Sequence, residues 1–138
     1  MVIIMVSLYN NEDKRQVVEV GVMDGCMYVI TTMGTHPCAY LVLPDSHPCS
    51  HLTCREQPLT VREITYSRSV DEFEEINMPD SWIVGWDYAH YGDYMHNRRS
   101  KDGHKYTLEE IRLDVLEMVH DLSDYEDYVV SGTYKNYL

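Results

Sequence analysis

Histidine and cysteine side chains gather between positions 36 and 54. The stretch contains His36, Cys38, His47, Cys49, His51 and Cys54. Imidazole nitrogens and thiolates are the ligands that zinc prefers. Structural zinc sites usually have paired, closely spaced ligands separated by a longer segment, and the spacing His47-x-Cys49-x-His51-x-x-Cys54 does not follow that rule. The sequence therefore predicts no bound metal and no cofactor, with Cys38 as a small buried thiol.

A second group of polar side chains follows the short apolar segment Ser81 to Trp86. Asp87, His90 and Asp93 come directly after it. A strand that ends in polar residues places them at the mouth of a sheet, where binding and catalytic sites are often built. An imidazole beside two carboxylates can serve as a general base or as an oriented hydrogen-bond donor. The alternative is that the two aspartates only cap turns.

The elements that must position these groups follow from local patterns. Strands are expected at Val17–Val22, Cys26–Thr32, Ala39–Leu43, Thr60–Ser67 and Ser81–Trp86, and a further strand at Tyr128–Ser131. Asp24-Gly25 between the first two predicts a hairpin with a type I′ turn. Thr107 and Glu110 form a capping box before an apolar stripe that runs from Leu108 to Leu122. The predicted fold class is α+β: a mainly antiparallel sheet, with an N-terminal meander, and one C-terminal amphipathic helix packed on it.

The whole chain has the size and composition of one globular domain, residues 1–138. We expect residues 1–16 to form an N-terminal arm or edge strand and residues 123–138 to form a tail. The net charge of −12 argues against binding to duplex nucleic acid or to an anionic membrane. Met1 to Leu8 lacks the features of a signal peptide, so a cytoplasmic protein with reduced thiols is predicted. A β-rich chain of this size also predicts a homo-oligomer, most simply a dimer.

Several separate motifs occur in a fixed order between Gly34 and Leu122. They are His36-Pro37-Cys38-Ala39-Tyr40, His47-Pro48, Thr65-Tyr66-Ser67 and Trp82 through Asp93, followed by the helix that starts at Thr107. The series resembles a family of small phage and prophage accessory proteins with the pattern H-x-C-G-Y-V, H-P, G-G-L-T-Y-S and W-x-x-G-F-D-x-A-H-x-G-D. The resemblance implies a phage gene whose product acts on host machinery or host defence.

The polar positions of that pattern supply the candidate site residues. The resemblance implies a site at His36, Cys38, Tyr40, His47, Thr65, Tyr66, Ser67, Asp87, His90 and Asp93, and Trp86 is added as a stacking aromatic residue. The chain departs from the pattern at Ala39 and at Arg62-Glu63, where the family has glycines. It also has Val61 where the family has a histidine, which argues against a mechanism that needs that imidazole.

Three functions from different classes are consistent with these residues. The favoured one is a module that binds a small anionic, nucleotide-like ligand and antagonises host defence signalling. Its base would stack on Tyr40, Tyr66, Trp86 or Tyr91, and its phosphates would contact Arg62, Arg68 or the basic residues Arg98, Arg99, Lys101 and Lys105. This hypothesis predicts that His36, Cys38, Asp87 and His90 converge on one pocket.

The two alternatives use the same residues differently. In a hydrolase-like enzyme, Cys38 or Ser67 would be the nucleophile and His36 or His90 its base, with Asp87 or Asp93 orienting the imidazole. An acidic inhibitor of a host defence complex would instead use its negative surface to cover a basic patch. The eight acidic residues against one arginine between Glu109 and Asp127 favour that reading only weakly, because such helical faces are common.

Overall fold

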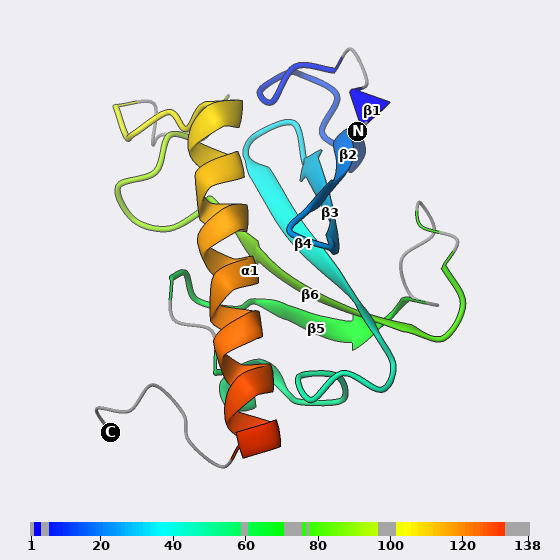
Figure 1. Ribbon diagram of the computed structural model, residues 1–138. Coiled ribbons are helices and arrows are strands. Elements are labelled where there is room, and N and C mark those ends of the chain that lie inside the picture. The colour runs from blue at the N-terminus through cyan, green and yellow to red at the C-terminus, as the bar shows by residue number, and fades with distance from the viewer. Residues whose placement is uncertain are drawn as a thin grey trace.

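The computed structural model describes residues 2–3, 6–58, 61–70, 76, 78–96 and 102–131 of the chain. These residues form a six-stranded antiparallel sheet, with one long helix, α1 (Leu108–Ser131), lying across one of its faces (Figure 1). The strands are β1 (Val2–Ile3), β2 (Gln16–Met23), β3 (Cys26–Thr32), β4 (Pro37–Pro44), β5 (Tyr66–Ser69) and β6 (Ser81–Asp87), in the order β1-β2-β3-β4-β6-β5. The predicted fold class is confirmed. In the described part of the chain, no helix has the length and apolar character needed to cross a membrane.

The β2–β3 hairpin turns at Asp24 and Gly25, as the sequence predicts. Their φ angles are 48° and 81°, and a type I′ turn requires positive φ at both central residues. Met23 and Cys26 pair on either side of the turn. This tight connection carries Asp24 and Cys26 to the side of the molecule where the second half of α1 lies.

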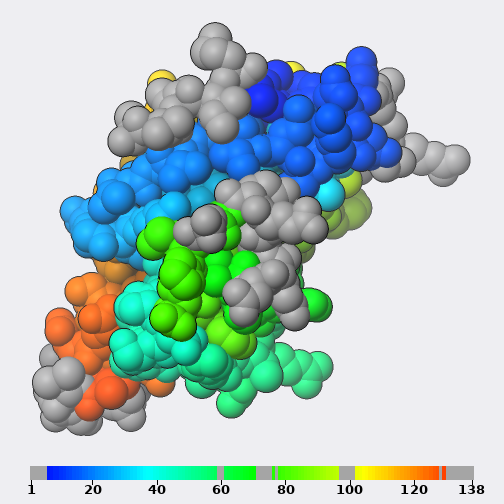
Figure 2. All heavy atoms as spheres, turned by 90° about the vertical axis from the view of Figure 1, so that its right-hand side faces the viewer, coloured from blue at the N-terminus to red at the C-terminus, as the bar shows by residue number. Residues whose placement is uncertain are grey.

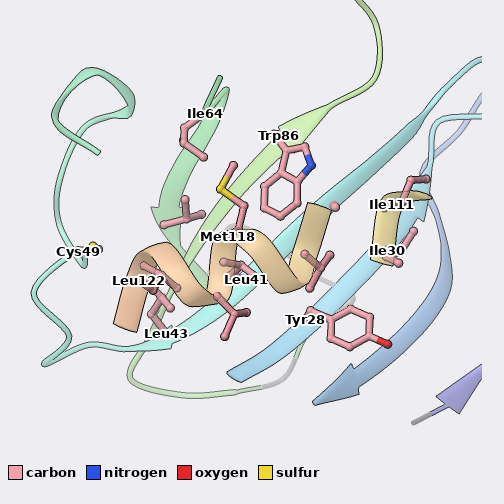
Figure 3. Close-up of a cluster of buried hydrophobic side chains, with 14 of the residues drawn as sticks. Tyr28, Ile30, Leu41, Leu43, Cys49, Ile64, Trp86, Ile111, Met118 and Leu122 are labelled. Atoms are coloured by element: carbon pink, nitrogen blue, oxygen red, sulfur yellow. The ribbon is translucent and has the colours of Figure 1, made fainter. Parts of the chain in front are cut away.

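The core fills the space between α1 and the sheet (Figure 3). The helix contributes Ile111, Val115, Met118, Val119 and Leu122, and the sheet contributes Tyr28, Ile30, Leu41, Leu43, Val84 and Trp86, among others. Thr107 and Glu110 make the predicted capping box: each side chain accepts a hydrogen bond from the other residue's backbone N–H. The apolar stripe of α1 is therefore covered by the sheet, and the helix starts where the sequence indicates.

A second apolar cluster lies on the opposite face of the sheet. It is built from Val29, Cys38, Tyr40, Val42 and Ile83 of the strands, together with Val70 and Ile76. Gly85 lets the Tyr40 ring approach the backbone of β6 closely, because a Cβ atom at position 85 would lie 2.3 Å from Tyr40 Cδ1.

Two predicted strands differ from the structure. The strand predicted at Thr60–Ser67 begins only at Tyr66, because Ile64 turns into the core and Arg62 reaches Asp114 of α1. The strand predicted at Tyr128–Ser131 is wrong: α1 continues through Ser131, since an established helix gains one hydrogen bond for each residue added. The predicted tail is therefore helical from 123 to 131.

Other predicted features agree with the structure or fall outside it. β1 pairs with β2, which confirms an edge strand in the N-terminal arm. The segment from Asp45 to Pro58 is a loop that contains one short 3-10 turn, Cys54–Glu56. Arg98, Arg99 and Lys101 of the basic residues considered for phosphate binding lie outside the described residues.

A buried carboxylate ties α1 to β2. A bulge at Val18 in β2 brings Glu19 into the interior, where its side chain is fully buried. Arg112 of α1 donates two hydrogen bonds to it, and the Tyr28 hydroxyl donates a third, 2.6 Å long. The hydrogen bonds from Arg112 hold the pKa of Glu19 below its ordinary value, against the opposing effect of burial.

Candidate functional site

Three carboxylates surround one imidazole at the end of β6. His90 Nδ1 lies 3.5 Å from Asp87 Oδ1 and 3.8 Å from Asp93 Oδ2, and His90 Nε2 lies 3.4 Å from Glu63 Oε2. The carboxylates flank opposite nitrogens of the ring, so they do not meet at one point. Among the residues that the structure describes, no group of three or more His, Cys, Asp or Glu side chains is placed to hold a metal ion.

The two aspartates of this cluster also cap turns. Asp87 Oδ1 accepts a hydrogen bond from the Ala89 backbone N–H, and Asp93 Oδ2 accepts one from the His90 backbone N–H. The same two side chains therefore cap turns and also lie beside the imidazole, so each of the two hypotheses made from the sequence describes part of what they do. These backbone contacts orient both carboxylates, and the half-exposed imidazole of His90 lies beside them.

Cys38 lies directly opposite Asp87 in the β4–β6 ladder. Burial, followed by the nearby Asp87 carboxylate, raises the pKa of the Cys38 thiol to about 12. Since the thiolate is the reactive form, a thiol in this setting is a poor nucleophile at neutral pH. The positive charge of Arg15 acts in the opposite direction on this pKa, which places a cation near the same spot.

His36 lies beside this group but is anchored locally. Its Nδ1 is 2.9 Å from the Thr35 hydroxyl in the turn between β3 and β4. The Tyr88 backbone N–H donates to the Pro37 carbonyl, so this turn and the end of β6 are neighbours. Of the four residues predicted to share a site, Cys38 and His90 each lie beside Asp87, and His36 lies on the adjoining turn, so their convergence on one pocket stays a prediction.

Two groups of aromatic side chains accompany this cluster: the Tyr40–Tyr66 pair and Tyr91. Tyr40 and Tyr66 pack edge to face, with ring centroids 5.5 Å apart, and Arg68 lies over the Tyr66 ring at 5.8 Å. Tyr91 directly follows His90, and its side chain is fully exposed. An exposed tyrosine beside hydrogen-bonding groups provides a flat surface on which a planar ligand can stack.

Three other candidates have structural roles. Trp86 faces α1 in the core, where its Nε1 donates to the Tyr88 hydroxyl, so the expectation that it stacks on a ligand is wrong. Ser67 donates to the Leu52 carbonyl and accepts from Trp82 and Gln57, which leaves its hydroxyl no role as a nucleophile. Arg62, considered for phosphate binding, pairs with Asp114 and lies over the Tyr88 and Tyr106 rings. Thr65 is exposed at the start of β5.

His47 belongs to a different part of the molecule. It follows β4, whereas His36 precedes that strand, and eight extended residues span roughly 26 Å. The loop that carries His47 runs beside the C-terminal half of α1 (Figure 2). A groove of about 360 Å³ lies there, between this loop, the β2–β3 turn and the helix.

Of the charged or ionisable groups around this groove, the sequence predicts only His47 as a binding residue. Asp24 was predicted only as a turn residue and Glu126 only as one of the acids of the helix, and His120, which contacts Asp24 without lining the groove, was not predicted. His47 Nε2 lies 2.6 Å from Glu126 Oε1, and His120 Nε2 lies 2.8 Å from Asp24 Oδ2. Both pairs join residues far apart in the sequence, so no local spacing could have revealed them.

Comparisons of the chain with protein-family models, with curated proteins and with solved structures found no match. The resemblance to phage accessory proteins therefore stays a prediction that rests on the motifs. The arrangement of the site itself is what bears on function.

Proposed function

We propose that this chain is a phage-type accessory protein that binds a small nucleotide-like ligand and so antagonises host defence signalling. The observation that carries the proposal is the fully exposed Tyr91 next to the Asp87–His90 pair. A base would stack on the Tyr91 ring, and ribose hydroxyls would donate to the Asp87 carboxylate. Sequestering a signalling molecule requires affinity and no turnover, which suits this site.

The charge distribution supports an orientation for such a ligand. Asp87, Asp93 and Glu63 make the His90 end negative, so phosphates would be repelled from it. Arg15 lies close enough to Cys38 and Tyr40 for its charge to lower the pKa of both, and Arg68 lies by Tyr66. The phosphates of the ligand would therefore extend toward the arginines and its hydroxyls toward Asp87.

The alternative of an enzyme has less support. Its two proposed nucleophiles are a thiol whose pKa is raised to about 12, Cys38, and a hydroxyl engaged in three hydrogen bonds, Ser67. Neither side chain has an imidazole as a hydrogen-bond partner in these contacts. Nucleophilic catalysis needs such a base within hydrogen-bond reach.

The test is to measure ligand binding with Tyr91 altered. Mononucleotides and cyclic dinucleotides would be titrated calorimetrically, and any small molecule released from the purified protein would be identified by mass spectrometry. We expect Tyr91→Ala to lower the affinity about tenfold or more through lost stacking. Tyr91→Phe, the matched control, should retain it, and neither change should alter the melting temperature because the side chain is exposed. Equal affinity for the parent and Tyr91→Ala would contradict the proposal.

A further inference from the structure

We infer that the groove beside α1 is a second binding site, separate from the one proposed above, and that it takes a short aliphatic diamine. Its volume of about 360 Å³ lies at the small end of the range for ligand pockets. Leu43, Val119 and Leu122 give it an apolar floor, and Asp24 and Glu126 give it two carboxylates. None of the described residues that line it is a lysine or an arginine.

The contacts of His47 leave the charge of Glu126 in place. His47 Nδ1 accepts a hydrogen bond from the Cys49 backbone N–H, so the ring proton of neutral His47 is on Nε2, which donates to Glu126. Both ring nitrogens of His47 then have a hydrogen-bond partner, and no second ring proton is needed. The pair therefore carries a net negative charge that an ammonium group can neutralise.

Both carboxylates are accessible to a ligand. The Glu126 side chain is 51% exposed and the Asp24 side chain 62%, although each contacts a histidine. His47, by contrast, is only 7% exposed and makes two hydrogen-bonding contacts, so it positions Glu126 from the buried side. An incoming cation would meet the carboxylates first.

The two carboxylates come from different elements, which favours a ligand with two charges. Asp24 lies on the β2–β3 turn, where it contacts His120, and Glu126 lies on α1 about 9 Å beyond the Cα position of His120 along the helix axis. Val119 and Leu122 lie in this part of the helix and line the groove. An α,ω-diamine places an ammonium group at each end and methylene groups over the apolar floor.

The groove is suited to binding rather than to covalent chemistry. Burial, with a smaller contribution from Glu126, raises the pKa of the Cys26 thiol to about 11. Its Sγ faces the carbonyl oxygens of Met27 and Val42 at 3.6 and 3.9 Å. Both nitrogens of His47 are already engaged, so the imidazole is not placed to accept a proton from this thiol.

The experiment is a calorimetric titration of the full chain with putrescine and cadaverine. Butylamine tests whether the second ammonium group matters, and succinate, a dicarboxylate of similar length, tests for an anion site. We expect the diamines to bind more tightly than butylamine, and Glu126→Gln and Asp24→Asn each to weaken their binding about fivefold. Glu117→Gln, an exposed acid of α1 outside the groove, should leave the affinity unchanged.

A bulky residue in the groove separates specific binding from attraction to the acidic surface. Ser123→Trp should abolish diamine binding, because Ser123 lines the groove, whereas Asp124→Trp on its exposed neighbour should not. Diamine binding that survives Ser123→Trp would overturn the inference, as would equal affinity for diamines and butylamine. Tighter binding of succinate, or of a lysine-rich peptide, at the groove would overturn it too. None of these results bears on Tyr91, so the function proposed above would stand or fall separately.

Discussion

Asp87 combines two roles in one side chain. Its Oδ1 caps the turn after β6 by accepting from the Ala89 N–H, and the same carboxylate lies 3.5 Å from His90 and opposite Cys38. An asparagine can make the backbone contact but carries no charge. Substitutions of Asp87 can therefore separate its contribution to turn capping from its contribution to ligand binding.

We predict that Asp87→Asn keeps the melting temperature within a few degrees and lowers nucleotide affinity about tenfold, because a carboxylate accepts hydroxyl hydrogen bonds more strongly than an amide. Asp87→Ala is the matched control: it also loses the cap and should destabilise the fold by about 1 kcal/mol. Thermal unfolding and calorimetric titration of both variants would check this. Unchanged binding by Asp87→Asn would remove Asp87 from the site.

At the scale of elements, the Glu19–Arg112–Tyr28 contacts join α1 to β2 and β3 through one buried carboxylate. Breaking such a pair on one side leaves an unpaired buried charge, which costs several kcal/mol. Arg112→Met should accordingly destabilise the protein far more than a neutral replacement of Glu19 does.

The same contact predicts how stability depends on pH. The folded-state pKa of Glu19 is lowered from 4.5, so its contribution is present above that unfolded-state value and is lost as the pH falls through the folded-state value. Urea unfolding of the parent and of Glu19→Gln between about pH 6 and about pH 3 should show a stability difference that shrinks with acidification. A constant difference across this range would contradict the assignment.

Local rules predicted the elements that depend on local chemistry. The Asp24-Gly25 turn and the Thr107–Glu110 capping box follow from residues in contact along the chain, and both are confirmed. The late start of β5 follows instead from the contact of Arg62 with α1, and the long helix from continued hydrogen bonding past residues that favour strands. Neither the contact between Arg62 and α1 nor the continuation of the helix can be recognised from a short stretch of sequence.

The candidate site residues also divide into those that a local motif predicted correctly and those whose place depends on the fold. Asp87, His90 and Asp93 lie within one motif, and the structure keeps them together. Trp86 belongs to the same motif but faces the other side of the sheet, because neighbouring strand residues alternate between faces. Which residues of β6 face a ligand depends on which side of the sheet α1 covers, and the sequence alone did not predict that side.

At the scale of the whole molecule, the charge of −12 acts against the compact state. The acids of α1 concentrate part of that charge on one element. Glu117 is exposed and lies four residues from Asp121, a spacing at which like charges on a helix repel each other, whereas the charge of Asp114, three residues away, is already paired with Arg62. This repulsion is screened by salt, so the parent protein should melt at a higher temperature at about 0.5 M than at about 0.05 M sodium chloride.

Glu117→Lys tests whether this repulsion limits stability. The change replaces the repulsive pair with Asp121 by an attractive one and should raise the free energy of unfolding by about 0.5 kcal/mol at low salt. Glu117→Gln removes the repulsion without adding attraction, so it should give roughly half of that gain. Both gains should shrink at high salt because Glu117 is exposed and the pair is screened. Urea unfolding at the two salt concentrations measures them, and a gain that is unaffected by salt would show that helix propensity, rather than charge, is responsible.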